Sequence, residues 1–218
     1  MKKILIGIAI LLLLGGGAYF LTKGDDDANQ AETQTNTQTS TDNQSSSGSN
    51  FSPVSTEGQD FVATITTSST AGTSTAKFEQ DGSKTRYTLS SNGQESQFVY
   101  TKDFYYSCSS GTCYKFPISQ SSSSGVDAKS YSYTQEQLAS YKNSATSKGR
   151  QDCPGGGTCE VWSVGTTTAS TTLYIDVNNQ RIRQVESTIG GATSKITYEY
   201  KDVTIAIPAN AKSLPTTP

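Results

Sequence analysis

Alternating hydrophobic and polar residues dominate the chain from residue 59 to residue 212 and predict a β domain there. Phe61, Ala63 and Ile65 are separated by single residues that would face the other side of a strand. Turn residues divide such segments, and Asn92-Gly93 is the strongest two-residue hairpin signal among them. The expected strands, about ten in number, lie near residues 61–66, 76–79, 86–89, 98–100, 104–106, 114–116, 161–164, 173–177, 182–189 and 196–200.

One helix is expected, from Thr134 to about Ser147. Thr134 followed three residues later by Gln137 matches a capping box. Leu138 and Tyr141 then begin an apolar stripe at helical spacing. We therefore predict a mainly β fold, a curved antiparallel sheet or half-barrel with one covering helix.

The alternation changes phase at Asp202, because Val203, Ile205 and Ile207 then occupy odd positions. One extra residue in a strand moves every later side chain to the other face. The shift therefore predicts a bulge or a turn at this point.

The expected sheet is too large for its helix to cover. Strands spaced 4.8 Å apart would make a sheet about 45 Å wide, whereas the helix covers roughly 21 Å by 10 Å. Either the sheet curls until it packs on itself, or part of its apolar face stays available to a ligand. Tyrosine, with 11 of its 12 copies beyond residue 24, suits the wall of such a cavity, but it also suits a half-exposed sheet. The residues expected to line the cavity are Phe78, Tyr87, Leu89, Phe98, Tyr100 and Tyr198.

An uncharged, mostly apolar run from Ile4 to Leu21 follows Lys2 and Lys3 at the start of the chain. Eighteen helical residues span about 27 Å, enough for the hydrocarbon core of a bilayer. The flanking lysines indicate a cytoplasmic N-terminus, which would place the rest of the chain outside the cytoplasm. Residues 1–24 are thus expected to form a single-pass anchor in the cell membrane. The alternative is a signal peptide cleaved after Ala18, which would release a secreted protein.

Residues 25–58 consist largely of Asp, Gln, Asn, Thr, Ser and Gly. A stretch with so few large apolar residues cannot offset its own ordering entropy. We expect a disordered linker over 25–58, followed by an extracytoplasmic domain over 59–212 and a tail over 213–218.

Charge and composition exclude several functions. Lys2, Lys3 and Lys23 are three of the 17 basic residues, so the 14 beyond residue 24 face 19 acidic residues, a net charge of −5. This balance argues against a nucleic acid or an anionic membrane face as partner. The chain has no histidine, the commonest general base and metal ligand. No metal or other cofactor is expected.

The one match to a catalytic motif does not fit the expected structure. Ser74 and Lys77 match the S-x-x-K motif of penicillin-recognising enzymes, but that motif requires a helix. In the strand expected here, side chains three residues apart point to opposite faces. We therefore predict a protein that is not an enzyme, with no catalytic residues.

Four cysteines form two local pairs, Cys108 with Cys113 and Cys153 with Cys159. In an exported chain an even number of cysteines indicates disulfides, although four cysteines allow three connectivities. The spacings are not the C-x-x-C that zinc and redox sites favour. Structural disulfides are the better interpretation.

The second half of the chain resembles the outer-membrane lipoprotein carrier superfamily, which includes LolA and the LppX and LprG lipoproteins. The similarity rests on Trp162, on a strand that ends at Asp176 followed by Arg181, and on a last strand with Asp202 and Pro208. It implies a curved half-barrel with a hydrophobic cavity lidded by helices. The helix that precedes the first strand in the family has no counterpart in residues 50–60, which lack a helical period.

The sequence is compatible with two functions. The first is a tethered cell-envelope protein that binds an apolar or lipidic ligand in the half-barrel. The second is a structural or adhesive surface module with no small ligand. An envelope protein partner is conceivable in either case, and its identity is unknown from the sequence.

Overall fold

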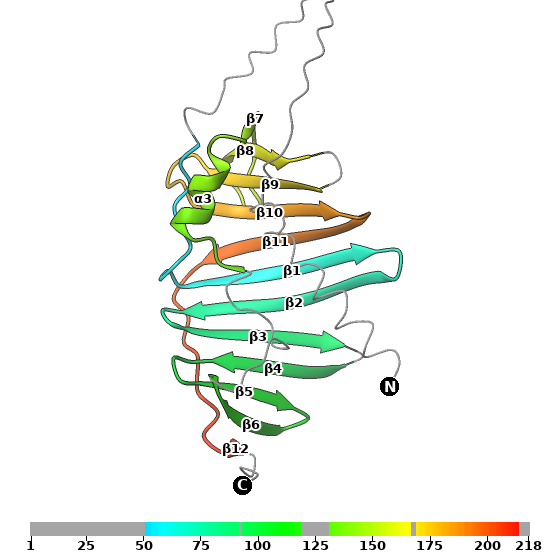
Figure 1. Ribbon diagram of the computed structural model, residues 1–218, viewed down its shortest axis with the longest axis vertical. Helices are drawn as coiled ribbons and strands as arrows, with labels where there is room; N and C mark the ends of the chain where they lie inside the picture. Colours follow the sequence, from blue (N-terminus) through cyan, green and yellow to red (C-terminus); the bar gives the residue numbers. More distant parts are fainter. Residues whose placement is uncertain (1–50, 92, 119–130, 167–168, 214–218) are drawn as a thin grey trace, which may run out of the picture.

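The computed structural model describes residues 51–91, 93–118, 131–166 and 169–213. Its strands form one twelve-stranded sheet in the order β12-β6-β5-β4-β3-β2-β1-β11-β10-β9-β8-β7 (Figure 1). This architecture confirms the predicted mainly β fold with an open, curved sheet. The elements are β1 (Phe61–Ser69), β2 (Gly72–Asp81), β3 (Lys84–Ser91), β4 (Gln94–Tyr100), β5 (Phe104–Ser109), β6 (Thr112–Pro117), α3 (Gln135–Tyr141), β7 (Thr146–Asp152), β8 (Thr158–Gly165), β9 (Ala169–Asp176), β10 (Ile182–Ile189), β11 (Ala192–Tyr200) and β12 (Lys212–Ser213).

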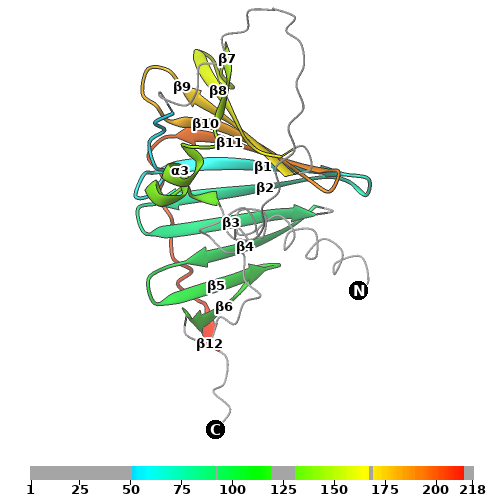
Figure 2. The same cartoon turned by 45° about the horizontal axis from the view of Figure 1, so that its top comes forward.

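Two antiparallel meanders build the sheet, β1 to β6 and β7 to β11. They join where β1 pairs with β11, with Phe61 opposite Tyr200 and Ile65 opposite Ile196. Only the short β12 is parallel to its neighbour, β6. The strands twist steadily from one edge to the other, and β7 and β12 remain the two edges of an open sheet (Figure 2).

The hairpin predicted at Asn92-Gly93 is confirmed by the strand register. Ser91 at the end of β3 pairs with Gln94 at the start of β4, which leaves two residues for the turn. Gly93 has φ 74°, a left-handed conformation that glycine adopts without a steric penalty.

The predicted helix is confirmed at its start and wrong at its end. The Gln137 amide donates to Thr134 Oγ1 at 3.1 Å, and the Thr134 amide donates to Gln137 Oε1 at 2.9 Å, so the capping box forms. The helix ends at Tyr141 instead of continuing to Ser147. Residues 146–152 are not helical because they form the edge strand β7, whose backbone pairs with β8.

The estimate of about ten strands missed two strands, β7 and β12. Strand β7 has the sequence TSKGRQD and is exposed along almost its whole length, so it carries no apolar alternation. Its register is interrupted between Ser147 and Arg150. Charged side chains and irregular register are how edge strands avoid pairing with other chains, and they also remove the usual sequence signal of a strand.

The sheet has two unequal faces. We call inner the face against which α3 packs, and it carries the main hydrophobic core. The buried residues of this core are Phe51, Phe61, Ala63, Ile65, Ala76, Phe78, Tyr87, Leu138, Tyr141, Ala145, Trp162, Val164, Leu173, Ile175, Ile182, Val185, Ile196 and Tyr198. On the opposite, outer face, Val99 and Tyr106 form a smaller core with Ile205.

After β11, residues 201–211 form a strap that runs beside the ends of β2 to β5 and leads to β12 (Figure 1). The phase change predicted at Asp202 therefore marks the end of a strand. The last strand with Asp202 and Pro208 that the family resemblance implied is not formed, because residues 201–208 have no strand partner. Ile205 is instead buried against the outer face.

Asp81 fastens the strap to the sheet. The Ile205 amide donates to Asp81 Oδ2 at 3.0 Å, and the Lys84 ammonium lies 3.0 Å from the same oxygen. These two interactions, the Ile205 amide foremost, hold the pKa of Asp81 below its ordinary value of 3.8.

Replacement of Asp81 by Asn is expected to release the strap. Hydrogen exchange at the Ile205 amide should accelerate, whereas Asp60→Asn, which alters a carboxylate bonded to the Gly82 amide, should leave it unchanged. In the wild-type protein a lowered pKa means that the stabilisation is complete above the unfolded-state pKa near 3.8 and is lost as the pH falls through the lowered folded-state value. An Ile205 amide equally protected in both variants would contradict this role.

Both disulfides join the local cysteine pairs, which settles the connectivity that the sequence left open. Cys108 bonds Cys113 across the β5–β6 hairpin, and Cys153 bonds Cys159 around a glycine-rich turn. Both members of the second pair are buried, whereas those of the first are half-buried.

Removing either disulfide is expected to weaken the domain without unfolding it. Closing loops this short stabilises by roughly 2 kcal/mol in the chain-entropy model. The double Ala variant at 108 and 113 should lose about that much unfolding free energy in urea. The double Ala variant at 153 and 159 should lose more, because it also leaves space in a buried site. Equal losses in the two variants would show that burial of the second pair adds nothing.

Residues 51–58, which we expected to belong to the linker, pack against the domain. Phe51 is buried and meets Trp162 edge-on, with ring centroids 5.4 Å apart. The segment has no helix, consistent with the absence of a helical period before the first strand. The expected anchor over Ile4–Leu21 lies outside the described residues. Within the described ranges, no helix combines the length and hydrophobicity that crossing a bilayer requires.

Candidate functional site

The six residues expected to line a cavity all lie on the inner face. The strand registers align Tyr198, Ala63, Phe78, Tyr87 and Phe98 in one row across β11, β1, β2, β3 and β4. Leu89 and Tyr100 lie two residues beyond members of this row, so their side chains share its face. The structure therefore brings the predicted residues together, although they come from four different strands.

Three of the six are covered by the chain itself. Phe78, Tyr87 and Tyr198 are at most 2% exposed. Tyr131 lies over the first two, stacked on Tyr87 at 5.5 Å between ring centroids and tilted on Phe78 at 5.4 Å. The Tyr198 hydroxyl donates to the Tyr131 carbonyl at 3.1 Å. The centre of the inner face is therefore filled by aromatic side chains of the protein.

Among the described residues, a small enclosed space lies beside Tyr131. It measures about 30 Å³ and lies between Tyr131, Tyr87, Leu89 and Ile65. A space of this size holds one or two water molecules and excludes an acyl chain. A ligand at the centre of the inner face would have to displace Tyr131.

Hydrogen bonds hold the covering segment in place. The Tyr133 amide donates to Thr56 Oγ1 at 2.7 Å, and the Thr56 amide donates to the Tyr133 carbonyl at 3.0 Å. From β2, Gln80 donates to the Thr56 and Gln59 carbonyls and accepts from Ser132 Oγ. Gln80 thus ties the segment before β1 and the segment before α3 to the same point of the sheet.

Beyond this covered half, the inner face carries a stack of aromatic rings over β4, β5 and β6. Tyr100 stacks on Tyr105 at 5.9 Å, and Tyr105 stacks on Phe116 at 4.6 Å, with interplanar angles of 22° and 9°. We call these three residues the aromatic row. All three are half-buried and belong to neither hydrophobic core. Tyr114, also on β6, lies on the same face and is more exposed.

Of the residues at this face, Tyr100 was predicted from the sequence, whereas Tyr105, Phe116 and Tyr131 were not. A signal for two of them was present in the cysteines. A disulfide across the β5–β6 hairpin places Cys108 opposite Cys113, and counting back along the two strands places Tyr105 opposite Phe116. Tyr131 had no such signal, because it precedes the helix in a segment without periodicity.

The phenols of the covered half are held neutral. Burial raises the pKa of Tyr87, Tyr131 and Tyr198 above the ordinary value of 10. These phenols therefore keep their protons near neutral pH. Among the described side chains, no three His, Cys, Asp or Glu residues gather as a metal site would require. The arrangement is suited to apolar contact.

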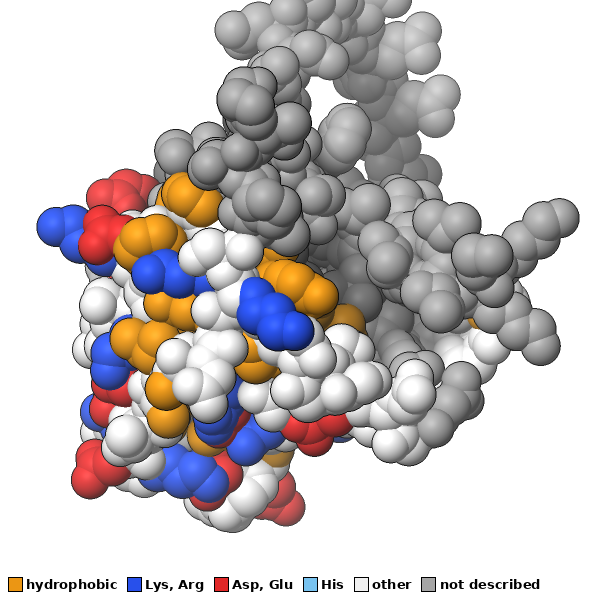
Figure 3. Space-filling model, turned by 90° about the horizontal axis from the view of Figure 1, so that it is seen from below, with side chains coloured by type: hydrophobic (Ala, Val, Ile, Leu, Met, Phe, Trp, Pro, Cys, Tyr) orange, Lys and Arg blue, Asp and Glu red, His pale blue; other side chains and the backbone are white. Residues whose placement is uncertain are grey.

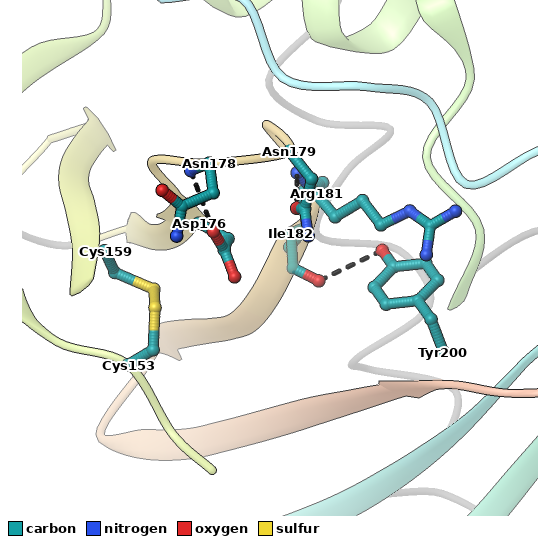
Figure 4. The surroundings of a disulfide bond; sticks show 8 residues. All are labelled: Cys153, Cys159, Asp176, Asn178, Asn179, Arg181, Ile182 and Tyr200. Carbon is teal, nitrogen blue, oxygen red and sulfur yellow. Dashed lines mark hydrogen bonds between the residues drawn. A yellow bond between two sulfur atoms is a disulfide. The ribbon is translucent and has the colours of Figure 1, made fainter. Parts of the chain in front are cut away.

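At the start of β10, one end of the inner face carries the basic side chain of Arg181. The Arg181 guanidinium lies over the Tyr200 ring, 4.8 Å from its centroid, and the Tyr200 hydroxyl donates to the Ile182 carbonyl at 3.0 Å. Figure 4 shows Arg181 and Tyr200 on one side of the β9–β10 turn and the Cys153–Cys159 disulfide on the other.

No protein-family model matches the chain, and no curated protein matches it. Solved structures that are similar to it include the lipoprotein LppX of Mycobacterium tuberculosis, with 12% identity and a TM-score of 0.47, covering 69% of this chain and 90% of LppX. LprF of Mycobacterium bovis has 15% identity and a TM-score of 0.46, covering 71% and 90%. MucB, solved with MucA of Pseudomonas aeruginosa, has 14% identity and a TM-score of 0.33, covering 70% of this chain and 54% of MucB. LppX, one of the lipoproteins named in the sequence resemblance, is among these similar structures.

Proposed function

We propose that the domain is a non-catalytic cell-envelope protein that binds an apolar or lipidic ligand against the aromatic row. The observation that carries the proposal is the half-buried stack of Tyr100, Tyr105 and Phe116 beside a fully packed core. Aromatic surface left outside a core is surface that gains from being covered by apolar groups.

The ligand would lie along the row, away from the centre of the inner face. Stacked rings turn their edges outward, which suits an acyl chain lying across them better than a sugar ring, which needs an open aromatic face. Phe98, which lies two residues from Tyr100 on β4 and packs against the main core, would extend the contact. Of the six residues predicted to line the cavity, Phe98 and Tyr100 would touch the ligand.

The place of action follows from the proposed anchor over Ile4–Leu21, with the domain outside the cytoplasm and within reach of the membrane. If the segment is instead cleaved after Ala18, the same domain would act as a secreted carrier.

A structural or adhesive surface module is the second candidate. One observation favours it, the small size of the enclosed space of about 30 Å³ at the centre of the inner face. In that case the aromatic row would be the contact surface for another macromolecule, and no small ligand would occupy it.

Photo-crosslinking in cells tests the proposal. Cells that produce the full chain would be fed a fatty acid carrying a diazirine, irradiated, and the labelled peptides identified by mass spectrometry. We expect label on peptides from β4, β5 and β6. Label confined to the N-terminal apolar segment would refute binding by the domain and favour the second candidate.

A further inference from the structure

Two arginines at the start of β10, Arg181 and Arg183, form no ion pair with any carboxylate that the structure describes. Among the described residues, five ion pairs form, and none of them includes Arg181 or Arg183. Asp176, which precedes the same turn, accepts the Asn178 amide at 2.9 Å. In Figure 4 the Arg181 guanidinium extends away from Asp176 and over the Tyr200 ring.

A β-bulge directs the second arginine. Ile182 pairs with Ile175 and Gln184 pairs with Tyr174, so Arg183 is the extra residue between two consecutive pairs. Bulges redirect a side chain out of the regular alternation, and they are frequent beside functional sites. The Arg183 side chain lies against the disulfide turn, where a Cβ added at Gly155 would be 3.4 Å from its Nη2.

The Arg183 Nε–H is buried, and no acceptor in the described part of the chain bonds to it. A buried donor without an acceptor is destabilising, and most such groups in folded proteins have a partner. An anion bound there would supply the acceptor. Both guanidiniums also lie close enough to the Tyr200 hydroxyl to oppose the rise that burial causes in its pKa.

We infer that Arg181 and Arg183 form a binding site for a phosphate or carboxylate group at the β9–β10 turn. The planar guanidinium groups match the geometry of such anions with paired hydrogen bonds. Tyr200 holds Arg181 in place through its ring, and the bulge and Gly155 position Arg183. The site is separate from the aromatic row, so the failure of either proposal leaves the other standing.

Titration of the full chain with inorganic phosphate tests the site. The protein would be held in dodecyl maltoside micelles, which contain no phosphate, and the arginine Nε–H signals followed by NMR. We expect the Arg183 signal to shift saturably. Arg183→Gln and Arg181→Gln should each weaken binding about tenfold or more, because a charge-assisted hydrogen bond is lost. Arg183→Lys should also bind more weakly, because the paired geometry is lost while the charge remains.

Arg150→Gln is the matched control, since it removes the same charge from an exposed position on β7. Phosphate affinity should be unchanged in this variant. A parallel titration with a short-chain phosphatidylglycerol separates the two sources of the anion. A response to phosphate alone indicates a soluble anion, and a stronger response to the lipid indicates a headgroup. The absence of a saturable response to either, or an equal loss in the Arg150 and Arg183 variants, would overturn the proposal.

Discussion

Replacing Phe61 by Ala is expected to destabilise the domain by about 3–5 kcal/mol, the usual cost of removing a fully buried aromatic ring. Phe61 is 0% exposed. Its ring meets Phe78, Tyr198 and Tyr200 at centroid distances of 5.8, 5.4 and 6.0 Å. It also lies on β1, where the two meanders join, so its loss weakens the contact that makes one sheet of them.

Urea unfolding followed by tryptophan fluorescence measures this loss, because Trp162 is buried in the same core. Phe116→Ala is the control, since it removes the same side chain from the half-buried aromatic row. Its cost should be well below that of Phe61→Ala because less surface is buried there. Comparable losses in the two variants would show that the row belongs to the core, and would argue against its being a ligand surface.

Replacing Tyr105 by Asp is expected to reduce lipid crosslinking to the domain by about tenfold or more, since burying a side chain of this size contributes roughly 1.5–3 kcal/mol. Tyr105 is the middle ring of the aromatic row, with Tyr100 on one side and Phe116 on the other. A carboxylate at this position would also have to lose water when an apolar ligand covers it. The domain itself should remain folded, because Tyr105 lies outside both hydrophobic cores.

Tyr174→Asp provides the matched control for this experiment. Tyr174 is also half-buried, but its register with Val161 and Gln184 places it on the outer face. The crosslinking yield should be unchanged in this variant. Equal loss of crosslinking from both substitutions would indicate a general effect of charge or stability and would contradict a site on the inner face.

Much of the fold follows from local patterns in the sequence. The alternation around Phe78, Tyr87 and Phe98 predicted both the strands and the face on which these side chains meet, because neighbouring hairpins transmit the register from strand to strand. The capping box at Thr134 likewise marked the start of the helix. Such features depend on residues that are close in sequence.

The features that were missed depend on distant contacts. The pairing of β1 with β11 brings Tyr198 next to Ala63, and nothing near either residue indicates it. The family resemblance implied a last strand with Asp202 and Pro208, whereas residues 201–208 pair with no strand. In the structure the Ile205 amide donates a hydrogen bond to the carboxylate of Asp81, the last residue of β2.

In the candidate site, too, the features set by residues close in sequence were predicted and those set by distant contacts were not. The six predicted residues share a face because of strand alternation, but Tyr131 decides which of them a ligand could reach. Its position depends on Gln80 and Thr56, which act through hydrogen bonds between segments far apart in the chain. Tyr131 covers the centre of the predicted cavity. The half-buried aromatic row therefore lies to one side of that centre, toward β6.

Native mass spectrometry of the full chain, purified in detergent from the cells that produce it, tests the central claim most directly. We expect the wild-type protein and the Tyr174→Asp variant to carry a co-purified lipid or other apolar molecule, and the Tyr105→Asp variant to have lost it. The same apolar adducts on all three proteins would assign them to the N-terminal segment. That result, or a wild-type protein with no adduct, would contradict ligand binding on the aromatic row.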